Sequence, residues 1–142
     1  NGNLTNPVEL SEKLSAVGRH VNTDSDSELL LNWFANAMAK QDQSANIQEQ
    51  VFGAMSQVMM GANGGYAGLY LINGVGLVGF RDPHGIRPLV FGCRKRRTTT
   101  NEFDEEGVPH TPTSMNVAEK LLDYVICSES VAIDTLGFKL VR

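Results

Sequence analysis

The residues with the clearest potential for chemistry stand at the start of the chain. Asn1 and Gly2 form an Asn-Gly pair, and an asparagine side-chain amide together with a neighbouring glycine N–H can donate two hydrogen bonds to one developing oxyanion. Glycine suits this role because its missing side chain lets the backbone approach a substrate closely. Taken alone, an Asn-Gly pair is more often a turn, so both interpretations stay open at this point.

Asp26 is the second candidate, because it lies in the first turn of an expected helix. The free N–H groups and the macrodipole of a helix N-terminus favour an ionised carboxylate, which can bind a substrate ammonium group. An ordinary acid at a helix start is the commoner explanation of such a residue. Position alone therefore makes Asp26 a candidate and assigns it no role.

The run RDPHGIRPL at residues 81–89 concentrates charge, turn residues and two prolines between two apolar segments. Asp82, Pro83 and Gly85 occupy the first, second and fourth places of a type I turn. We expect an ion pair of Asp82 with Arg81 or Arg87 to fix this turn. The histidine in the run has no carboxylate, serine or cysteine partner at a catalytic spacing, so we expect no catalytic role for it.

The two cysteines give no sign of a metal or catalytic site. Cys93 and Cys127 lie in apolar strand contexts typical of inert, buried thiols. Together with three scattered histidines they form no metal-ligand spacing, so we expect no metal site. The basic run at residues 94–97 is followed by an acidic segment and contains no interleaved aromatic residues. We therefore interpret it as the start of a solvated polar loop over residues 94–114.

The elements that must position these residues begin with three amphipathic helices. The first starts at Asn6, which can cap it with Glu9 completing a capping box, and the second starts after Ser25 with Glu28 in the same relation. The third spans about residues 45–60. We expect one apolar face formed by Ile47, Val51, Phe52, Met55, Val58 and Met59, and we interpret the cluster of Met55, Met59 and Met60 as core.

Strands follow the helices. Residues 66–72 and 75–81 flank Asn73-Gly74, which favours a hairpin with a type I′ turn. Further strands are expected at residues 89–93, 121–127 and 138–141, with a short helical turn at residues 130–136. Helices followed by an antiparallel meander predict an α+β layered domain over residues 1–142, with residues 94–114 as a loop insertion.

Composition limits the class of protein. The chain has 142 residues, 42% of them hydrophobic, and a formal net charge of −4. No apolar run approaches the roughly 18 residues of a membrane span. The net acidity disfavours a general nucleic-acid binder. We therefore expect a cytoplasmic globular domain without membrane or nucleic-acid partners, and the missing initiator Met leads us to expect a start inside a longer chain.

Several segments, taken in order, resemble the amidophosphoribosyltransferase family, and within it the N-terminal glutaminase domain. This domain is a class II glutamine amidotransferase of the N-terminal-nucleophile hydrolase type. The segments are NGNLTN at 1–6, NTDSDSE at 22–28, GGYA at 64–67, RDPHGIRPL at 81–89, SESVA at 128–132 and GF at 137–138. The resemblance spans nearly the whole chain.

The resemblance implies a four-layer αββα sandwich, here incomplete, and a reaction. An N-terminal cysteine thiolate attacks the side-chain amide of glutamine, which forms a thioester and releases ammonia. A phosphoribosyltransferase domain then uses the ammonia to make phosphoribosylamine from phosphoribosyl pyrophosphate in purine synthesis. By the same resemblance, Asn1 and Gly2 would form the oxyanion hole and Asp26 would bind the α-amino group of glutamine.

The resemblance also implies what this chain lacks. The family's nucleophile is the first residue of the mature enzyme, whereas this chain begins with Asn1. Neither Cys93 nor Cys127 carries a free α-amino group, so we expect the chain by itself to be inactive as a glutaminase. The implied partners are glutamine, a transferase domain in the same longer protein and further copies in a homo-oligomer. No cofactor is expected in this domain, and Mg²⁺ is expected only in the transferase domain.

Three alternatives stand beside this interpretation. One is the glutaminase domain of another class II amidotransferase, of the asparagine synthetase or glucosamine-6-phosphate synthase type. Another is a degenerate, non-catalytic domain that serves binding or oligomerisation. A nucleic-acid binder acting through residues 94–97 ranks last.

Overall fold

Helices precede the long strands in the computed structural model, which describes residues 1–96 and 121–141. The chain divides into two units, Asn1–Leu89 and Val90–Arg142. The first unit contains an antiparallel sheet in the order β1-β2-β3. Its elements are β1 (Gly2–Leu4), α1 (Pro7–Ala16), α2 (Asp26–Met38), α3 (Ile47–Gly61), β2 (Gly64–Ile72) and β3 (Gly76–Arg81).

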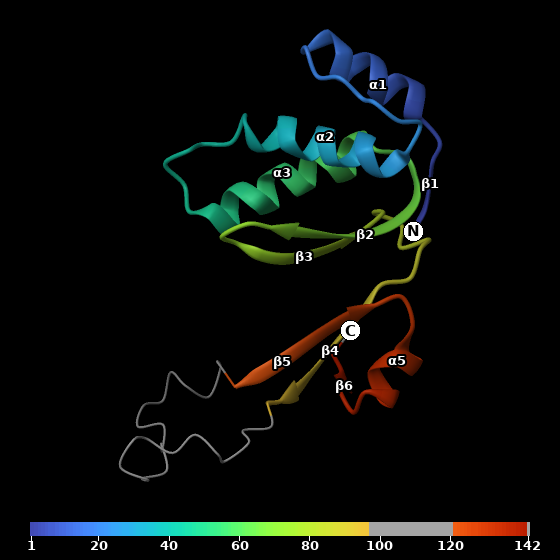
Figure 1. Cartoon of the computed structure of the whole chain (residues 1–142), viewed down its shortest axis with the longest axis vertical. Coiled ribbons are helices and arrows are strands. Elements are labelled where there is room, and N and C mark those ends of the chain that lie inside the picture. The colour runs from blue at the N-terminus through green and yellow to red at the C-terminus, as the bar shows by residue number, and fades with distance from the viewer. Residues whose placement is uncertain (97–120, 142) are drawn as a thin grey trace. The chain divides into compact units, whose positions relative to one another are not determined.

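The first unit is layered. Figure 1 shows α2 and α3 over one face of the β2–β3 hairpin, with α1 on the far side of these two helices. The ring of Tyr70 lies between those of Phe34 and Phe80, with centroid distances of 5.2 Å and 4.6 Å. Helices packed on one face of an antiparallel sheet confirm the α+β class. The core between the layers includes Leu10, Leu14, Leu29, Phe34, Val58, Tyr66 and Phe80.

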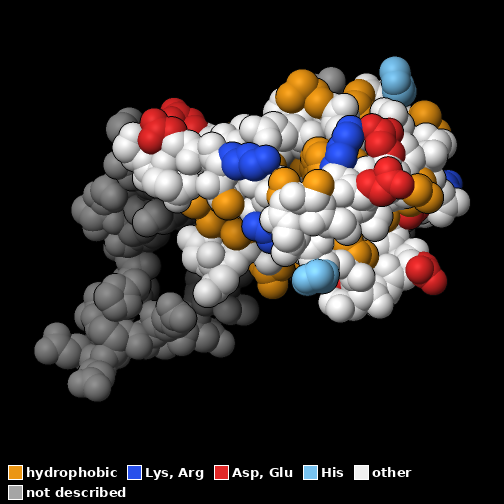
Figure 2. Space-filling model, turned by 90° about the horizontal axis from the view of Figure 1, so that it is seen from above, with side chains coloured by type: hydrophobic (Ala, Val, Ile, Leu, Met, Phe, Trp, Pro, Cys, Tyr) orange, Lys and Arg blue, Asp and Glu red, His pale blue; other side chains and the backbone are white. Residues whose placement is uncertain are grey.

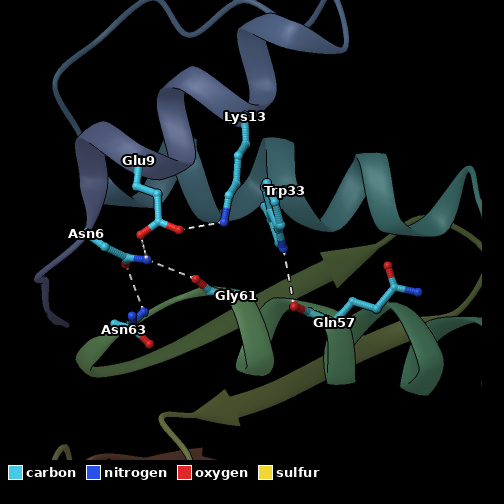
Figure 3. Close-up of polar contacts among 7 residues, drawn as sticks. All are labelled: Asn6, Glu9, Lys13, Trp33, Gln57, Gly61 and Asn63. Atoms are coloured by element: carbon cyan, nitrogen blue, oxygen red, sulfur yellow. Dashed lines mark hydrogen bonds and ion pairs between the residues drawn. The ribbon is translucent and has the colours of Figure 1, made fainter.

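The start of α1 is held differently from the prediction. The capping box is wrong for this helix, because the Asn6 side chain makes no capping hydrogen bond. Its Oδ1 instead accepts the N–H of Asn63 at 2.9 Å, and its Nδ2 donates to the Gly61 carbonyl at 3.0 Å (Figure 3). The Asn6 amide also contacts Glu9, which forms an ion pair with Lys13. Asn6 therefore ties the entry of α1 to the exit of α3.

The start of α2 follows the prediction in part. Ser25 caps the helix, since its Oγ accepts the N–H of Ser27 at 3.3 Å. Glu28 does not close a capping box on Ser25. Its carboxylate reaches further back and accepts the N–H groups of Asn22 and Thr23, both at 2.8 Å. These bonds fix the loop that leads into the helix carrying Asp26.

The buried face of α3 is narrower than predicted. Val51, Ala54, Met55 and Val58 form the buried stripe. Phe52 lies about 100° further round the helix than Val51, outside the buried stripe, and 71% of its surface is exposed. Core positions predicted for Ile47, Phe52 and Met60 are therefore wrong, since all three are exposed.

The hairpin between β2 and β3 is confirmed, but the type of its turn is not. Gly74 has a φ of +74°, whereas no non-glycine residue in the described part of the chain has a positive φ. A type I′ turn needs positive φ at both central residues, so it is wrong here. The N–H of Val75 donates to the Ile72 carbonyl at 3.0 Å. Negative φ at Asn73 followed by positive φ at glycine is the pattern of a type II turn.

The described residues of the second unit form another antiparallel sheet, in the order β5-β4-β6. Strand β1 was missed, and a single meander is wrong because the strands divide between two sheets. Helix α5 places Ile133, which is fully buried, against Gly92, where a Cβ would lie 2.9 Å from Ile133 Cγ2. The elements are β4 (Val90–Lys95), β5 (Leu122–Cys127), α5 (Ser130–Thr135) and β6 (Lys139–Leu140).

The expected polar loop begins later than predicted, because Arg94 and Lys95 belong to β4. The Arg94 guanidinium lies over the Phe138 ring, 4.2 Å from its centroid, and donates to the Leu136 carbonyl at 2.7 Å. Arg96 and Arg94 both pair with Asp123. The hydrogen bond from Arg96, together with these positive charges, lowers the pKa of Asp123. Residues 97–114 of the predicted loop lie outside the described residues.

Charge on the surface is mixed. On the face shown in Figure 2, Lys and Arg side chains alternate with Asp and Glu and form no large patch of one sign. Among residues 1–96 and 121–141, no helix is long and apolar enough to cross a membrane. The same residues contain no group of three His, Cys, Asp or Glu side chains placed to hold a metal ion.

Candidate active-site pocket

The three residues singled out from the sequence lie along one pocket. Asn1, Gly2 and Asp26 all line a cavity of about 230 Å³ in the first unit. Strand β1 forms one side, the first turn of α2 a second, and β2 a third, where Tyr66 and Tyr70 contribute apolar wall. The fold therefore brings together two segments that are separated by helix α1.

The hydrogen-bond pattern of β1 determines where the Gly2 N–H points. The backbone nitrogen of Asn1 donates to the Ala67 carbonyl and the Ala67 N–H donates to the Asn1 carbonyl, both at 2.8 Å. Bonded and non-bonded pairs alternate along an antiparallel ladder, so the next pair, Gly2 and Tyr66, is non-bonded. The Gly2 N–H is therefore directed away from β2 and is not used by the ladder.

The side of β1 toward which this N–H points is also the side of Asp26. The N–H of Leu4, two residues further along the strand, donates to Asp26 Oδ2 at 2.7 Å. Residues two apart in a strand direct their backbone groups to the same side. Gly2 thus presents a backbone donor, and Asp26 a carboxylate, on one side of the strand.

Glycine is required at position 2. Its φ is +107°, and a Cβ placed there would lie 2.0 Å from the Gly65 carbonyl oxygen and 2.8 Å from Tyr66 Cα. Both neighbours are backbone atoms of β2, so no side chain can turn aside to make room. Gly2 begins a strand pressed against its neighbour, and Asn1 is paired with Ala67 by two backbone hydrogen bonds, so the turn interpretation is wrong.

Asp26 holds β1 and retains a free oxygen. It is the first residue of α2, directly after the Ser25 cap, and it is half-buried. Oδ2 accepts the Leu4 N–H, and within the described residues Oδ1 makes no hydrogen bond. A carboxylate that lines a pocket, with one oxygen anchored and the other without a partner among the described residues, is suited to binding a cationic group.

Asp82 organises the 81–89 run without an ion pair. Its carboxylate is 1% exposed and accepts four backbone N–H groups, from Tyr66 at 3.3 Å, His84 at 3.0 Å, Ile86 at 3.0 Å and Arg87 at 3.1 Å. Burial acts to raise the pKa of Asp82, but the four donors outweigh it and lower the pKa overall. The predicted pairing with Arg81 or Arg87 is wrong, since no such ion pair occurs among the described residues. The turn itself is confirmed, because the Gly85 N–H donates to the Asp82 carbonyl at 3.0 Å.

Sequence reasoning missed the contribution of β2. Tyr66 faces Gly2 across the ladder, and Gly65 supplies the carbonyl against which Gly2 packs. In the sequence, the signal for this contact is the Gly64-Gly65 pair at the start of the GGYA segment. Burial raises the pKa of both Tyr66 and Tyr70, so both phenols stay neutral in the pocket wall.

Comparison with known proteins places the chain among amidotransferases. A family model described as the glutamine amidotransferase domain matches residues 1–101. The chain is 44% identical to the amidophosphoribosyltransferase of Pseudomonas aeruginosa over 143 residues, covering 100% of this chain and 24% of that protein. The corresponding identities are 40% for Escherichia coli and 41% for Schizosaccharomyces pombe, with 100% of this chain and 24% and 23% of those proteins covered. The chain thus spans about a quarter of the length of these relatives.

A solved structure shares the fold. It is the glutamine phosphoribosylpyrophosphate amidotransferase from B. subtilis complexed with ADP and GMP. The match has a TM-score of 0.55 and 23% sequence identity, and covers 100% of this chain and 23% of that one.

Proposed function

Because this chain belongs to the glutamine amidotransferase domain family, we propose that it is part of the glutaminase domain of an amidophosphoribosyltransferase. The observation that carries the proposal is the pocket in which the Gly2 N–H and the Asp26 carboxylate face the same side of β1. The Gly2 N–H would stabilise a negative charge, and the Asp26 carboxylate would bind a positive one.

Glutamine fits this pair of groups. Its α-ammonium group would bind Asp26 Oδ1, and its side-chain carbonyl would lie at Asn1 and Gly2. Attack of a thiolate on the amide carbon turns the carbonyl oxygen into an oxyanion, which the Asn1 amide and the Gly2 N–H stabilise. Ammonia leaves as the carbonyl re-forms, and a glutamyl thioester remains. Loss of one such donor typically costs about 3 kcal/mol of transition-state stabilisation.

The nucleophile must come from elsewhere in the longer protein, because none of the residues lining the pocket is a cysteine. We assign it to an N-terminal cysteine whose α-amino group acts as the base. The chain by itself is then inactive as a glutaminase. Release of ammonia from glutamine by the isolated chain would contradict this assignment.

The names of the relatives support a proposal for how the ammonia is used. In the longer protein, ammonia would displace pyrophosphate from phosphoribosyl pyrophosphate in a separate transferase domain and give phosphoribosylamine for purine synthesis. That domain would need Mg²⁺, whereas the glutaminase pocket needs no cofactor. A homo-oligomer in the cytoplasm completes the proposal. The amidophosphoribosyltransferase names of the relatives favour this acceptor over those of asparagine synthetase or glucosamine-6-phosphate synthase.

We propose that the domain is an αββα sandwich of four layers, of which this chain forms part. The hairpin face turned away from α2 and α3 carries Leu69, Leu71 and Leu77, which are 46%, 83% and 54% exposed. Leu71 and Leu77 are direct partners in the ladder. A second sheet packed on this face would bury all three side chains, as the inner layers of a sandwich require.

A chimera tests the proposed function. In it, this chain replaces the 143 aligned residues of the P. aeruginosa amidophosphoribosyltransferase. We expect the chimera to make phosphoribosylamine from either glutamine or free ammonia. Asp26→Asn should raise the KM for glutamine at least tenfold, because the ammonium loses its counter-charge, and should leave the ammonia-dependent rate unchanged. A chimera that uses ammonia but not glutamine would refute the proposal, since it would be folded and yet lack a working glutaminase.

A further inference from the structure

Asp82 is a buried carboxylate for which the reaction proposed above has no use. Asp82 is 1% exposed, and within the described part of the chain its carboxylate accepts hydrogen bonds only from backbone N–H groups. Fixing the turn at residues 82–85 requires only the bond from His84 and the backbone bond from Gly85. The bonds from Tyr66 and Ile86 extend beyond this turn, and both lead toward Gly2.

The first connection runs through Tyr66. Asp82 Oδ2 accepts the Tyr66 N–H at 3.3 Å, and the Asp82 N–H donates to the Tyr66 carbonyl at 2.8 Å. Both backbone groups of Tyr66 are therefore held by one residue. Tyr66 stands directly opposite Gly2 in the β1–β2 ladder without a hydrogen bond between them. Contact between the two backbones transmits the position of Tyr66 to Gly2.

The second connection runs through Ile86. The Ile86 N–H donates to Asp82 Oδ1 at 3.0 Å. This hydrogen bond fixes the backbone from which the Ile86 side chain extends. That side chain packs on Gly65, where a Cβ would lie 2.7 Å from Ile86 Cγ2. Gly65 also packs on Gly2, because a Cβ built on Gly2 would lie 2.0 Å from the Gly65 carbonyl oxygen. Ile86, Gly65 and Gly2 therefore pack in contact, with no side chain on either glycine to absorb a shift.

From these two connections we infer that Asp82 is a positioning residue for the oxyanion donor Gly2, an inference that rests on the proposed function. Asp82 touches no substrate. Asp82 fixes the position of the backbone at Gly65 and Tyr66. Gly2 packs against this backbone, and this contact keeps the Gly2 N–H directed toward the pocket. A displacement of about 1 Å at a catalytic group can cost on the order of 100-fold in rate.

Asp82→Asn in the chimera tests the inference. Asparagine keeps the shape of the side chain but replaces one acceptor oxygen with an NH₂ donor, so part of the set of four N–H groups loses its acceptor. We expect kcat for glutamine to fall about 10- to 100-fold, with KM for glutamine within about twofold, because Gly2 acts on the transition state and Asp26 on the ground state. The ammonia-dependent rate should not change. His84→Ala is the matched control, since its exposed side chain makes none of these contacts while its N–H is kept, and it should behave like the unsubstituted chimera.

Ile86→Ala provides a second measurement if Asp82→Asn fails to fold. It removes the packing on Gly65 and keeps every backbone bond to Asp82, and we expect a smaller fall in kcat, about threefold to tenfold, again at constant KM. Unchanged kcat in a folded Asp82→Asn variant, or a rise in KM equal to the fall in kcat, would overturn the inference. If Asp82→Asn does not fold, unchanged kcat in Ile86→Ala overturns it. An unsubstituted chimera that cannot use glutamine refutes the proposed function, and the inference about Asp82 is then refuted as well because it rests on that function.

Discussion

Alanine at position 2 would test the geometry of β1 most directly. Its Cβ would lie 2.0 Å from the Gly65 carbonyl oxygen, and the φ of +107° is one that side chains rarely adopt. The carbonyl oxygen and the φ angle both belong to the backbone, so no side chain can move to make room. Strand β1 can therefore respond only by separating from β2. Gly18→Ala is the matched control, since Gly18 has a φ of +75° but nothing within 4 Å of its would-be Cβ.

The magnitudes of the two substitutions should differ. Gly18→Ala carries only the backbone strain of a left-handed residue, about 1 kcal/mol. Gly2→Ala can relieve its strain only by separating β1 from β2, so its cost is what β1 contributes to stability. Burial of Leu4 is worth about 2 kcal/mol, and the bond from the Leu4 N–H to the Asp26 carboxylate is worth about 1.5 kcal/mol. We expect Gly2→Ala to lower the free energy of unfolding by roughly 3.5 kcal/mol.

Urea unfolding of the chain measures both values, and amide hydrogen exchange locates the change. The Ala67 N–H donates to the Asn1 carbonyl and the Leu4 N–H to Asp26, so both should lose protection in Gly2→Ala and keep it in Gly18→Ala. Equal destabilisation by the two substitutions, with Ala67 still protected, would refute the argument that Gly2 is sterically required.

Three further predictions concern the first unit. Tyr70→Phe should raise the free energy of unfolding by about 1 kcal/mol, because the Tyr70 hydroxyl is buried and has no hydrogen-bond partner among the described residues; urea unfolding measures this. Asn6→Ala should lower the free energy of unfolding by about 1–2 kcal/mol, because the Asn63 N–H and the Gly61 carbonyl lose their partner. Lys13→Ala, which breaks only an exposed ion pair, should change it by under about 0.5 kcal/mol in the same assay. The pKa of Asp82 is lowered from 3.8 in the folded protein, so its stabilisation is complete above that value and is lost as the pH falls through the lower folded pKa. Asp82→Asn should therefore flatten the acid side of a stability curve recorded from neutral pH downward, and an unchanged acid side would contradict the four-donor arrangement.

The helices could be predicted from the sequence because their signals are local. Ser25 caps α2 within its own first turn, and the stripe from Val51 to Val58 repeats at helical spacing. Asn6 shows where such reasoning fails. Its type and position fit a cap, yet its side chain binds Asn63 and Gly61, partners that only the folded chain brings near.

In the candidate site, too, the residues could be predicted from the sequence, whereas contacts made only in the folded chain could not. Asn1, Gly2 and Asp26 were found from residue type and motif, and the fold places them along one pocket. The direction of the Gly2 N–H depends on a partner strand more than sixty residues away in the sequence. Asp82 was expected to pair with arginine because charges of opposite sign stood beside it, but in the fold four backbone N–H groups bind its carboxylate oxygens instead.

The alternation along β1 gives the register of this short strand a chemical meaning. A slip by one residue against β2 would turn the Gly2 N–H into the ladder and send that of Asn3 toward the pocket. It would also remove the Leu4 N–H from Asp26. The Thr5 N–H donates to the Asn63 carbonyl, and the Asn63 N–H donates to Asn6 Oδ1. These two hydrogen bonds hold the end of β1 in register and oppose this slip. The site therefore depends on the two-residue link between β1 and α1, formed by Thr5 and Asn6, as much as on the residues that line the pocket.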